Sequence, residues 1–257
     1  MDREELIEKI TQKKEFSKLR KIDVELAFEK FDKKEFSDLD KIKLTRDLLR
    51  KVFSAFTSQK LLSLKEKDFE WFLKKHLSTR ERYYFYEKLY ERILKNDKGL
   101  SVIDLGSGVN GFSYDYLKKF DVNYLAIDSI GQFIDLMNHY FRKEGLRAKA
   151  AHFSLFELEE IKNLIKKTEK PRIVFLFKTI DSLEMIERDY SKKLLSELFP
   201  LVDKIIISFA TRSLIRGIRF KAQRNWILNF LKDNFEILDD FELGNERYLV
   251  VQKKKHL

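Results

Sequence analysis

The hydrophobic and polar positions follow two different periods along the chain, and the change comes near residue 99. Before it, apolar residues recur three and four positions apart, as in Leu44, Leu48 and Val52. This spacing places them on one face of an amphipathic helix. The first glycine is Gly99, and no proline precedes it. We therefore expect residues 1–98 to form an N-terminal all-helical domain.

From residue 100, short apolar runs alternate with stretches of helical period. The runs typical of strands are Ser101–Leu105, Tyr124–Ile127, Ile173–Phe177, Lys204–Phe209 and Tyr248–Val251. The helical stretches are Phe112–Lys119, Gly131–Lys143, Leu158–Lys167, Ser191–Phe199 and Arg216–Asn234. Strands that alternate with helices predict an α/β domain of Rossmann-like type, with a mainly parallel sheet and helices on both faces. We expect this second domain to span residues 99–257.

Composition narrows the class of protein. Charged residues make up 37% of the chain, and no apolar run reaches the length of a transmembrane helix, so a cytoplasmic globular protein is expected. The charged N-terminus lacks the apolar core of a signal peptide. The absence of cysteine excludes disulfides, thiolate metal sites and thiol nucleophiles, and the four histidines show no metal-ligand spacing. We expect no metal site.

The net charge of +10 favours a polyanionic partner. Residues 1–98 carry 26 lysines and arginines against 20 acids, so most of the excess lies in the helical part. This part is interpreted as an accessory module with a basic face. A set of ordinary solvated helix surfaces is the alternative.

Three glycines stand within six residues in the stretch SVIDLGSGVNGF, at Gly106, Gly108 and Gly111. A glycine turn between a strand and a helix is typical of nucleotide-type ligands, although the GxGxxG spacing alone is weak evidence, and the string of a phosphate P-loop is absent. Asp104 precedes Gly106 by two residues, a form that resembles motif I of class I S-adenosylmethionine-dependent methyltransferases. Asp128 ends the second strand, 24 residues after Asp104, where an acid receives ribose hydroxyls. A nicotinamide cofactor, or a capping role for Asp128, remains the alternative.

Three further stretches, and the N-terminus, resemble one family. They read HLSTRER, VFLFKTIDSLE and IIISFATRSLIRG, and the N-terminal stretch reads ITQKKEFSKL. In combination they resemble the aminoglycoside-resistance 16S rRNA methyltransferases that modify N7 of a guanine in the decoding site. The resemblance spans nearly the whole chain. It implies S-adenosyl-L-methionine as cofactor and the 16S rRNA of the small ribosomal subunit as partner.

The sequence departs from the family pattern at five places. Ser107 stands for a cysteine, and Gly111, Asp181 and Ala210 stand for prolines. Near the third strand, where the family has a Gln-Asp pair close to the adenine, the chain reads AHFSLF, with His152 and Phe153. The chain therefore lacks that acid as an acceptor for the adenine amino group.

The resemblance also implies roles for individual residues. Arg80 is expected to bind the carboxylate of the cofactor, since a guanidinium donates two parallel hydrogen bonds. Ser78 or Thr79 could equally cap a helix there. The full set of expected cofactor-binding residues is His76, Arg80, Asp104, Gly106, Ser107, Gly108, Asp128, Ser129, Phe153 and Ser154.

Guanine N7 carries a lone pair and no proton, so its methylation needs no general base, and none is expected. The reaction then depends on orientation of the ring. Phe209 is the candidate stacking platform for a flipped guanine, with Arg212 and Lys178 beside it. Phe209 could instead be ordinary core, and Arg212 an ordinary exposed arginine.

Twelve basic residues are expected to contact RNA, and the protein is expected to be a monomer. They are Lys13, Lys14, Lys18, Arg20, Lys21, Arg46, Arg50, Lys51, Arg216, Arg219, Lys221 and Arg224. A methyltransferase of the same fold acting on another RNA or a small molecule is one alternative function. An RNA-binding homologue without catalysis is another.

Overall fold

The computed structural model describes residues 1–54, 68–95, 97–212 and 224–254. The chain begins with three helices, α1 (Arg3–Thr11), α2 (Lys21–Glu29) and α3 (Asp38–Leu49), and α3 continues into a π-helical turn, η1 (Arg50–Ser54). Asp2 forms a capping box with Glu5 at the start of α1, and Ser37 caps α3. The apolar faces of these helices meet in a core of their own, which includes Ile10 and Phe28. The helical prediction for this segment is confirmed.

The next helices pack on the sheet. They are α4 (Phe69–Lys75), α5 (Leu77–Arg82), η2 (Tyr83–Phe85) and α6 (Tyr86–Ile93). Side chains of α6 share one hydrophobic core with the sheet, and the rings of Tyr90 and Phe175 are stacked with centroids 6.0 Å apart. By their hydrophobic packing, the helices of this segment belong with the sheet that begins after residue 98. The sequence periodicity instead predicts them as part of an N-terminal domain of residues 1–98.

Seven strands form one sheet in the order β3-β2-β1-β4-β5-β7-β6. They are β1 (Ser101–Leu105), β2 (Asn123–Asp128), β3 (Ala148–His152), β4 (Arg172–Phe177), β5 (Lys204–Ala210), β6 (Phe235–Leu243) and β7 (Glu246–Lys253). The first five in this order are parallel, and β7 runs antiparallel to both its neighbours. The chain reverses its direction of strand addition between β1 and β4, which opens a crevice at the carboxyl ends of these strands.

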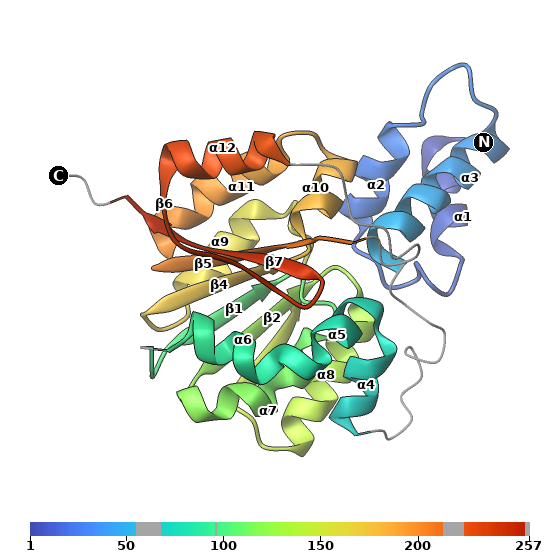
Figure 1. The fold of residues 1–257 in the computed structure, drawn as a ribbon. Coiled ribbons are helices and arrows are strands. Elements are labelled where there is room, and N and C mark those ends of the chain that lie inside the picture. The colour runs from blue at the N-terminus through green and yellow to red at the C-terminus, as the bar shows by residue number, and fades with distance from the viewer. Residues whose placement is uncertain (55–67, 96, 213–223, 255–257) are drawn as a thin grey trace.

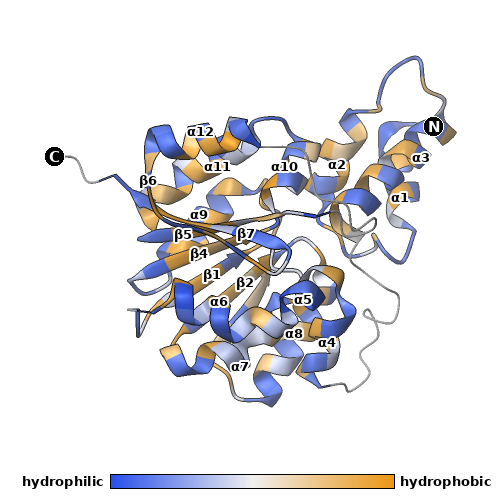
Figure 2. Cartoon of the chain, in the orientation of Figure 1, coloured by the Kyte–Doolittle hydropathy of each residue, from blue (hydrophilic) through white to orange (hydrophobic). Residues whose placement is uncertain are grey.

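Helices cover both faces of the sheet, as the sequence predicts (Figure 1). One face carries α4–α6 with η3 (Asn110–Ser113), α7 (Tyr114–Leu117), η4 (Lys118–Phe120) and α8 (Gly131–Lys143). The other carries α9 (Leu158–Lys166), α10 (Ile180–Ile186), α11 (Tyr190–Leu198), η5 (Phe199–Leu201) and α12 (Asn225–Asn234). Hydrophobic colour is concentrated in the strands and on helix faces turned toward them (Figure 2). Along β1, Val102 belongs to one core, and Ile103 and Leu105 belong to the other.

Helices α1–α3 with their loops and η1 (residues 1–54) form the α1–α3 unit, also called the helical unit. It lies beside α10, at the end of the sheet where the crevice opens (Figure 1). The backbone of Lys18–Arg20 joins it to the loop after β2. Gly131 N donates to Lys18 O at 2.9 Å, and Arg20 N donates to Ser129 O at 3.2 Å. The helical unit therefore closes one side of the crevice.

Candidate active site

A cavity occupies the crevice, with about 870 Å³ of empty volume that includes open solvent. Its walls come from the turn after β1, the end of β2, the start of α10, α5 and the α1–α3 unit. Of the ten residues expected to bind a cofactor, seven line it, namely His76, Asp104, Gly106, Ser107, Gly108, Asp128 and Ser129.

The glycine turn fits tightly under its neighbours. Gly106 and Gly108 have φ of +68° and +55°, which glycine adopts without steric cost. A Cβ on Gly106 would lie 2.9 Å from Thr179 Cγ2, and one on Gly108 would lie 3.2 Å from His76 Cε1. The turn is fixed by hydrogen bonds from Gly106 N to Ile127 O (2.9 Å) and from Gly108 N to Asp128 Oδ2 (2.7 Å).

Gly111 lies outside the cavity lining, and its small size allows α8 to pack closely against the turn. A Cβ there would lie 2.7 Å from Met137 Sδ and 2.8 Å from Phe141 Cζ, both on α8. A larger residue would push α8 away from the turn. This contact gives a physical reason for glycine at the position where the resembled family has proline.

Two buried acids stand at the ends of neighbouring strands. Asp104 Oδ2 accepts hydrogen bonds from Asn110 Nδ2 (2.7 Å) and the Tyr124 hydroxyl (2.5 Å), and burial raises the pKa of this carboxyl. Burial also raises the pKa of Asp128 to about 6, although the N–H groups of Ile130 and Gly108 lower it in part. The charge of Asp104 raises the pKa of Asp128 further. A cationic ligand in the cavity would offset this repulsion.

A third buried acid reaches the cavity from α2. Asp23 is 1% exposed, and burial raises the pKa of its carboxyl to about 7, while the nearby hydroxyls of Ser154 and Ser129 lower it in part. The charge of Asp128 raises the pKa of Asp23 as well. The cavity thus has carboxyls at the ends of β1 and β2 and a third from the helical unit.

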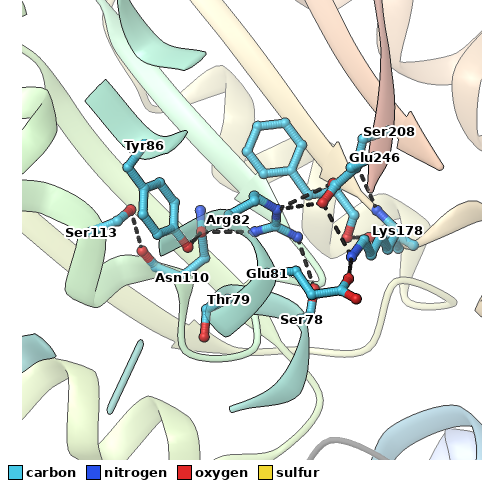
Figure 3. A network of polar contacts seen from close by, with 12 residues as sticks. Ser78, Thr79, Glu81, Arg82, Tyr86, Asn110, Ser113, Lys178, Ser208 and Glu246 are labelled. Carbon is cyan, nitrogen blue, oxygen red and sulfur yellow. Dashed lines mark hydrogen bonds and ion pairs between the residues drawn. The ribbon is translucent and has the colours of Figure 1, made fainter. Parts of the chain in front are cut away.

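Arg82 forms the centre of a polar network behind the cavity (Figure 3). Its guanidinium donates to Glu246 Oε2 (2.9 Å), Asn110 Oδ1 (3.0 Å) and Ser78 Oγ (2.8 Å). Burial would raise the pKa of Glu246, but the charges of Arg82 and Lys178 lower it overall. The pair is ionised, and it ties α5 to β7.

Lys178 extends this network to the cavity wall. Its ammonium contacts Glu81 Oε2 (2.5 Å) and Glu246 Oε2 (3.2 Å), and its side chain is 8% exposed. Lys178 directly follows β4 and has φ of +58°, and its N–H donates to Ser208 Oγ at 3.0 Å. Burial, with the charges of Arg82 and Lys178, lowers the pKa of His76 to about 3, so this imidazole is neutral at physiological pH.

Three expected cofactor-binding residues lie outside the cavity lining. Arg80 is exposed, because it points away from the face of α5 that carries Ser78, Thr79 and Arg82 to the cavity. Arg82 is therefore the arginine of this motif that the structure brings to the site. Phe153 packs under the guanidinium of Arg20, 5.6 Å from the ring centroid.

Ser154 is the third, and it contributes indirectly. It is fully buried and donates its hydroxyl to Asp23 Oδ1 at 2.6 Å, while Leu155 and Phe156 after it line the cavity.

The three residues expected to position a guanine lie in three different environments. Phe209 is 3% exposed and belongs to the core, under the guanidinium of Arg224 at 5.2 Å, so its ring face is not available for stacking. Arg212 is exposed and outside the cavity lining. Lys178 alone of the three lines the cavity.

Four arginines expected to contact RNA are held by partners within the protein. Arg20 binds Glu157, Arg46 donates to the carbonyls of Lys9 and Ile10, and Arg50 binds Glu15 and Asp47. Arg224 pairs with Asp181 (2.7 Å) and donates to Ala210 O (3.1 Å). Asp181 and Ala210, two of the positions that depart from the family pattern, thus both contact Arg224.

The expected lysines are placed differently. Lys18 pairs with Asp135 and Lys21 with Glu4, all exposed. Lys13, Lys14 and Lys51 are exposed and form no ion pair with the residues that the structure describes. Arg216, Arg219 and Lys221 lie outside the described residues.

Sequence reasoning missed several lining residues. Arg82 stands two positions after Arg80, and only the helical phase of α5 separates them. Asp23 belongs to no motif, and Thr179 and Ser182 lie within the stretch VFLFKTIDSLE but were not singled out, because the approach of all three to the cavity depends on how α2 and α10 dock. Periodicity along one segment cannot show this.

Within the described ranges, no group of three histidine, aspartate or glutamate residues could hold a metal ion. Nor is any helix in those ranges long and apolar enough to cross a membrane.

Comparison with known proteins gives structural likeness without sequence matches. No protein-family model matches the chain, and no curated protein does. Among solved structures, the 16S rRNA methyltransferase RmtF in complex with S-adenosyl-L-homocysteine has a TM-score of 0.81 at 20% identity, over 99% of this chain and 100% of that one. The 16S rRNA methylase RmtB has a TM-score of 0.78 at 19% identity, over 99% of both chains. An rRNA methylase from Escherichia coli has a TM-score of 0.78 at 20% identity, over 98% of this chain and 99% of that one. Over its whole length the chain therefore has the fold of 16S rRNA methyltransferases, a class I methyltransferase sheet preceded by an N-terminal helical region.

Proposed function

We propose that the chain is an S-adenosylmethionine-dependent methyltransferase that methylates N7 of a guanine in the decoding site of 16S rRNA within the small ribosomal subunit. One observation carries the proposal. The cavity at the β1–β4 crevice is lined by a glycine turn between the strand-end acids Asp104 and Asp128, in a chain whose fold matches 16S rRNA methyltransferases end to end.

The residues of the cavity fit the methyl donor. Ser107 Oγ is buried at the glycine turn and has no hydrogen-bond partner among the described residues, which leaves a polar atom for a ligand. The turn and Asp104 would hold the methionine part, and Asp128 would accept from ribose hydroxyls. When bound, the donor supplies an electrophilic methyl group on a sulfonium cation, and the clustered carboxyls suit its positive charges.

The reaction asks little acid–base chemistry of the protein. Because guanine N7 bears a lone pair and no proton, the chain has to orient the ring and exclude misaligned approaches. Lys178 lines the cavity and would donate to guanine O6 beside N7. Its ammonium stays between Glu81 and Glu246, which fixes its position.

The base must leave its stack to reach the cavity. N7 faces the deep, narrow major groove of A-form RNA, which side chains hardly enter, so the enzyme would take up an unstacked or flipped guanine. Since Phe209 is buried, we propose no stacking role for it. Arg212 remains a candidate for a phosphate or base contact at the rim.

The basic surface of the helical unit would hold the ribosomal substrate. Lys13, Lys14 and Lys51 are exposed, so they would be able to contact phosphates. Docking by such a surface would favour the assembled subunit over naked RNA as the substrate.

The test is transfer of a labelled methyl group from S-adenosylmethionine to purified small subunits, with naked 16S rRNA and tRNA in parallel. We expect label in the 16S rRNA of assembled subunits, lost in Asp128→Ala and kept in Asp135→Ala, an exposed acid on α8. Label only in tRNA or naked RNA would overturn the ribosomal substrate. No label and no cofactor binding would favour an RNA-binding protein without catalysis.

A further inference from the structure

The helical unit contributes a carboxylate to the cavity that no motif predicts. Asp23 lies on α2, is 1% exposed and lines the cavity beside Asp128 and Ser129. A buried carboxylate is costly unless its oxygens accept hydrogen bonds or meet a charge. Its contacts therefore indicate what it is placed to bind.

One oxygen of Asp23 is used and the other is not. Oδ1 accepts from the Ser154 hydroxyl at 2.6 Å, and Ser154 Oγ in turn accepts from Phe156 N at 3.1 Å. Oδ2 is buried and has no hydrogen-bond partner among the described residues. The Ser154 contact fixes the orientation of the carboxylate, and Oδ2, which has the Ser129 hydroxyl near the carboxylate but no hydrogen bond to it, is open to a further donor.

Contacts to the loops after β2 and β3 hold the segment around Asp23 in place. The Arg20 guanidinium binds Glu157, at the start of α9, and Leu19 forms a β-bridge with Ile130 after β2. These contacts join the start of α2 to the loops that follow β2 and β3. Asp23 is accordingly a fixed part of the cavity wall.

The other acid in this region, Glu157, lies outside the cavity lining, and both its oxygens are engaged by donors of the protein. Glu157 Oε2 accepts from Ser154 N (2.7 Å) and from Arg20 Nε (2.9 Å), and Oε1 accepts from Arg20 as well. The loop between β3 and Glu157 reads FSLF and contains no acid. Among the described residues, Asp23 is thus the carboxylate available to a ligand beside the end of β3.

Three acceptors then follow the order of the strands. Asp104 is the penultimate residue of β1, Asp128 ends β2, and Asp23 lies against Ser154 just beyond β3. A methyl donor with the covalent order methionine, ribose, adenine matches this order when it lies across the strand ends. Ile130, Leu155 and Leu183 supply apolar lining suited to a flat ring.

We infer that Asp23 Oδ2 accepts a hydrogen bond from the 6-amino group of the donor's adenine, so that the helical unit completes the cofactor site. The inference rests on the proposed function, because it takes S-adenosylmethionine as the ligand. It makes the α1–α3 unit part of the cofactor site as well as a surface for RNA. The adenine amino group would be recognised from outside the sheet domain.

The test compares two ligands by calorimetry, without turnover. The first is S-adenosylhomocysteine, and the second is its analogue with hydrogen in place of the 6-amino group. Wild-type protein should bind the first on the order of tenfold more tightly, because the analogue leaves a buried carboxylate without a partner. Asp23→Ala should bind both with equal affinity. Asp135→Ala, which removes an acid that pairs with Lys18 at the same junction, should keep the wild-type ratio.

Each outcome has a distinct meaning. If wild-type protein binds both ligands equally, or if Asp23→Ala keeps the tenfold ratio, the role of Asp23 is overturned while the cofactor site stands. If wild-type protein binds neither ligand, the proposed function fails and the inference with it. The ratio is measured first in wild-type protein. The inference can therefore be refuted even if a variant does not fold.

Discussion

At the scale of single residues, the cavity holds buried acids that form no ion pair with the residues that the structure describes. Asp128 is 7% exposed, and both its oxygens accept backbone N–H groups, from Gly108 at 2.7 Å and Ile130 at 2.8 Å. This carboxylate both shapes the glycine turn and faces the cavity. Its removal should therefore affect binding and stability together.

Asp128→Ala should lower the affinity for S-adenosylhomocysteine by more than about tenfold and destabilise the protein by about 1–3 kcal/mol. The first effect comes from lost ribose contacts and the second from two N–H groups without an acceptor. Calorimetry and urea unfolding measure the two. Unchanged affinity in a folded variant would contradict the placement of the ribose.

The protonation of Asp23 makes a second prediction. Burial raises the pKa of this carboxyl in the folded protein to about 7, above its ordinary value of 3.8, so the native state binds the proton more tightly than the unfolded chain. The stability from this group is full at pH values below about 4 and is lost as pH rises through about 7. The ionisable groups near it are Asp128, Glu157, Arg20 and Tyr190.

Asp23→Asn removes this titration. From pH 5 to pH 8, the free energy of unfolding of the variant relative to wild type should rise by about 1–3 kcal/mol. Urea unfolding at the two pH values measures it. Parallel pH dependence of the two proteins would show that the Asp23 carboxyl titrates normally.

Some site residues could be predicted from the sequence because the signal is local. Asp104 and Asp128 follow apolar runs directly, and parallel strands bring such residues to one edge. Asp23 could not be predicted, because its place depends on docking of α2 against loops more than 100 residues later. The choice of Arg82 over Arg80 depends on the helical phase of a six-residue helix, α5.

At the scale of elements, the Arg82–Glu246 pair joins α5 to β7 behind the cavity. The two side chains are 3% and 2% exposed, so neither charge is screened by water. Removing one partner of a buried pair leaves the other charge uncompensated. Lys178 also contacts Glu246 and would compensate part of that charge.

Arg82→Met should destabilise the protein by an amount near the lower end of about 3–5 kcal/mol, the range for broken buried pairs. Arg80→Met, two positions away and exposed, should change stability by less than about 0.5 kcal/mol and leave S-adenosylhomocysteine binding unchanged. Thermal unfolding and calorimetry on both variants provide the comparison. Equal effects of the two substitutions would contradict the assignment of Arg82 to the site.

The elements themselves were predicted unequally well. The runs in β1, β2, β4, β5 and β7 are continuous and apolar, as expected of strands covered on both faces. Two strands escaped this pattern. β3 reads AKAAH and lies at the sheet edge, half-exposed, and β6 at the other edge alternates buried with exposed positions.

At the scale of the whole molecule, the two roles of the helical unit can be separated. Asp23 and Arg20 face the methyltransferase domain, whereas Lys13, Lys14 and Lys51 are exposed. The inner face is proposed to complete the cofactor site, and the outer face to bind the ribosome. Substitutions on the outer face should affect only the second role.

The double variant Lys13→Glu/Lys14→Glu should bind small subunits more weakly, with a less steep dependence on salt. The slope of log K against log salt is negative, and each lost phosphate contact reduces its magnitude by about 0.7–0.9. Affinity for S-adenosylhomocysteine should not change. Filter binding of subunits over a range of salt concentrations measures the slope, and an unchanged slope would place the RNA-binding surface elsewhere.

The most direct test of the proposed methylation of guanine N7 identifies the atom that receives the methyl group. Small subunits treated with the protein and S-adenosylmethionine would be reduced with borohydride and cleaved with aniline, which breaks RNA at N7-methylguanine. We predict one new cleavage in 16S rRNA, at a guanine of the decoding site, that depends on the methyl donor. Labelled rRNA without that cleavage would contradict N7 of a guanine as the acceptor.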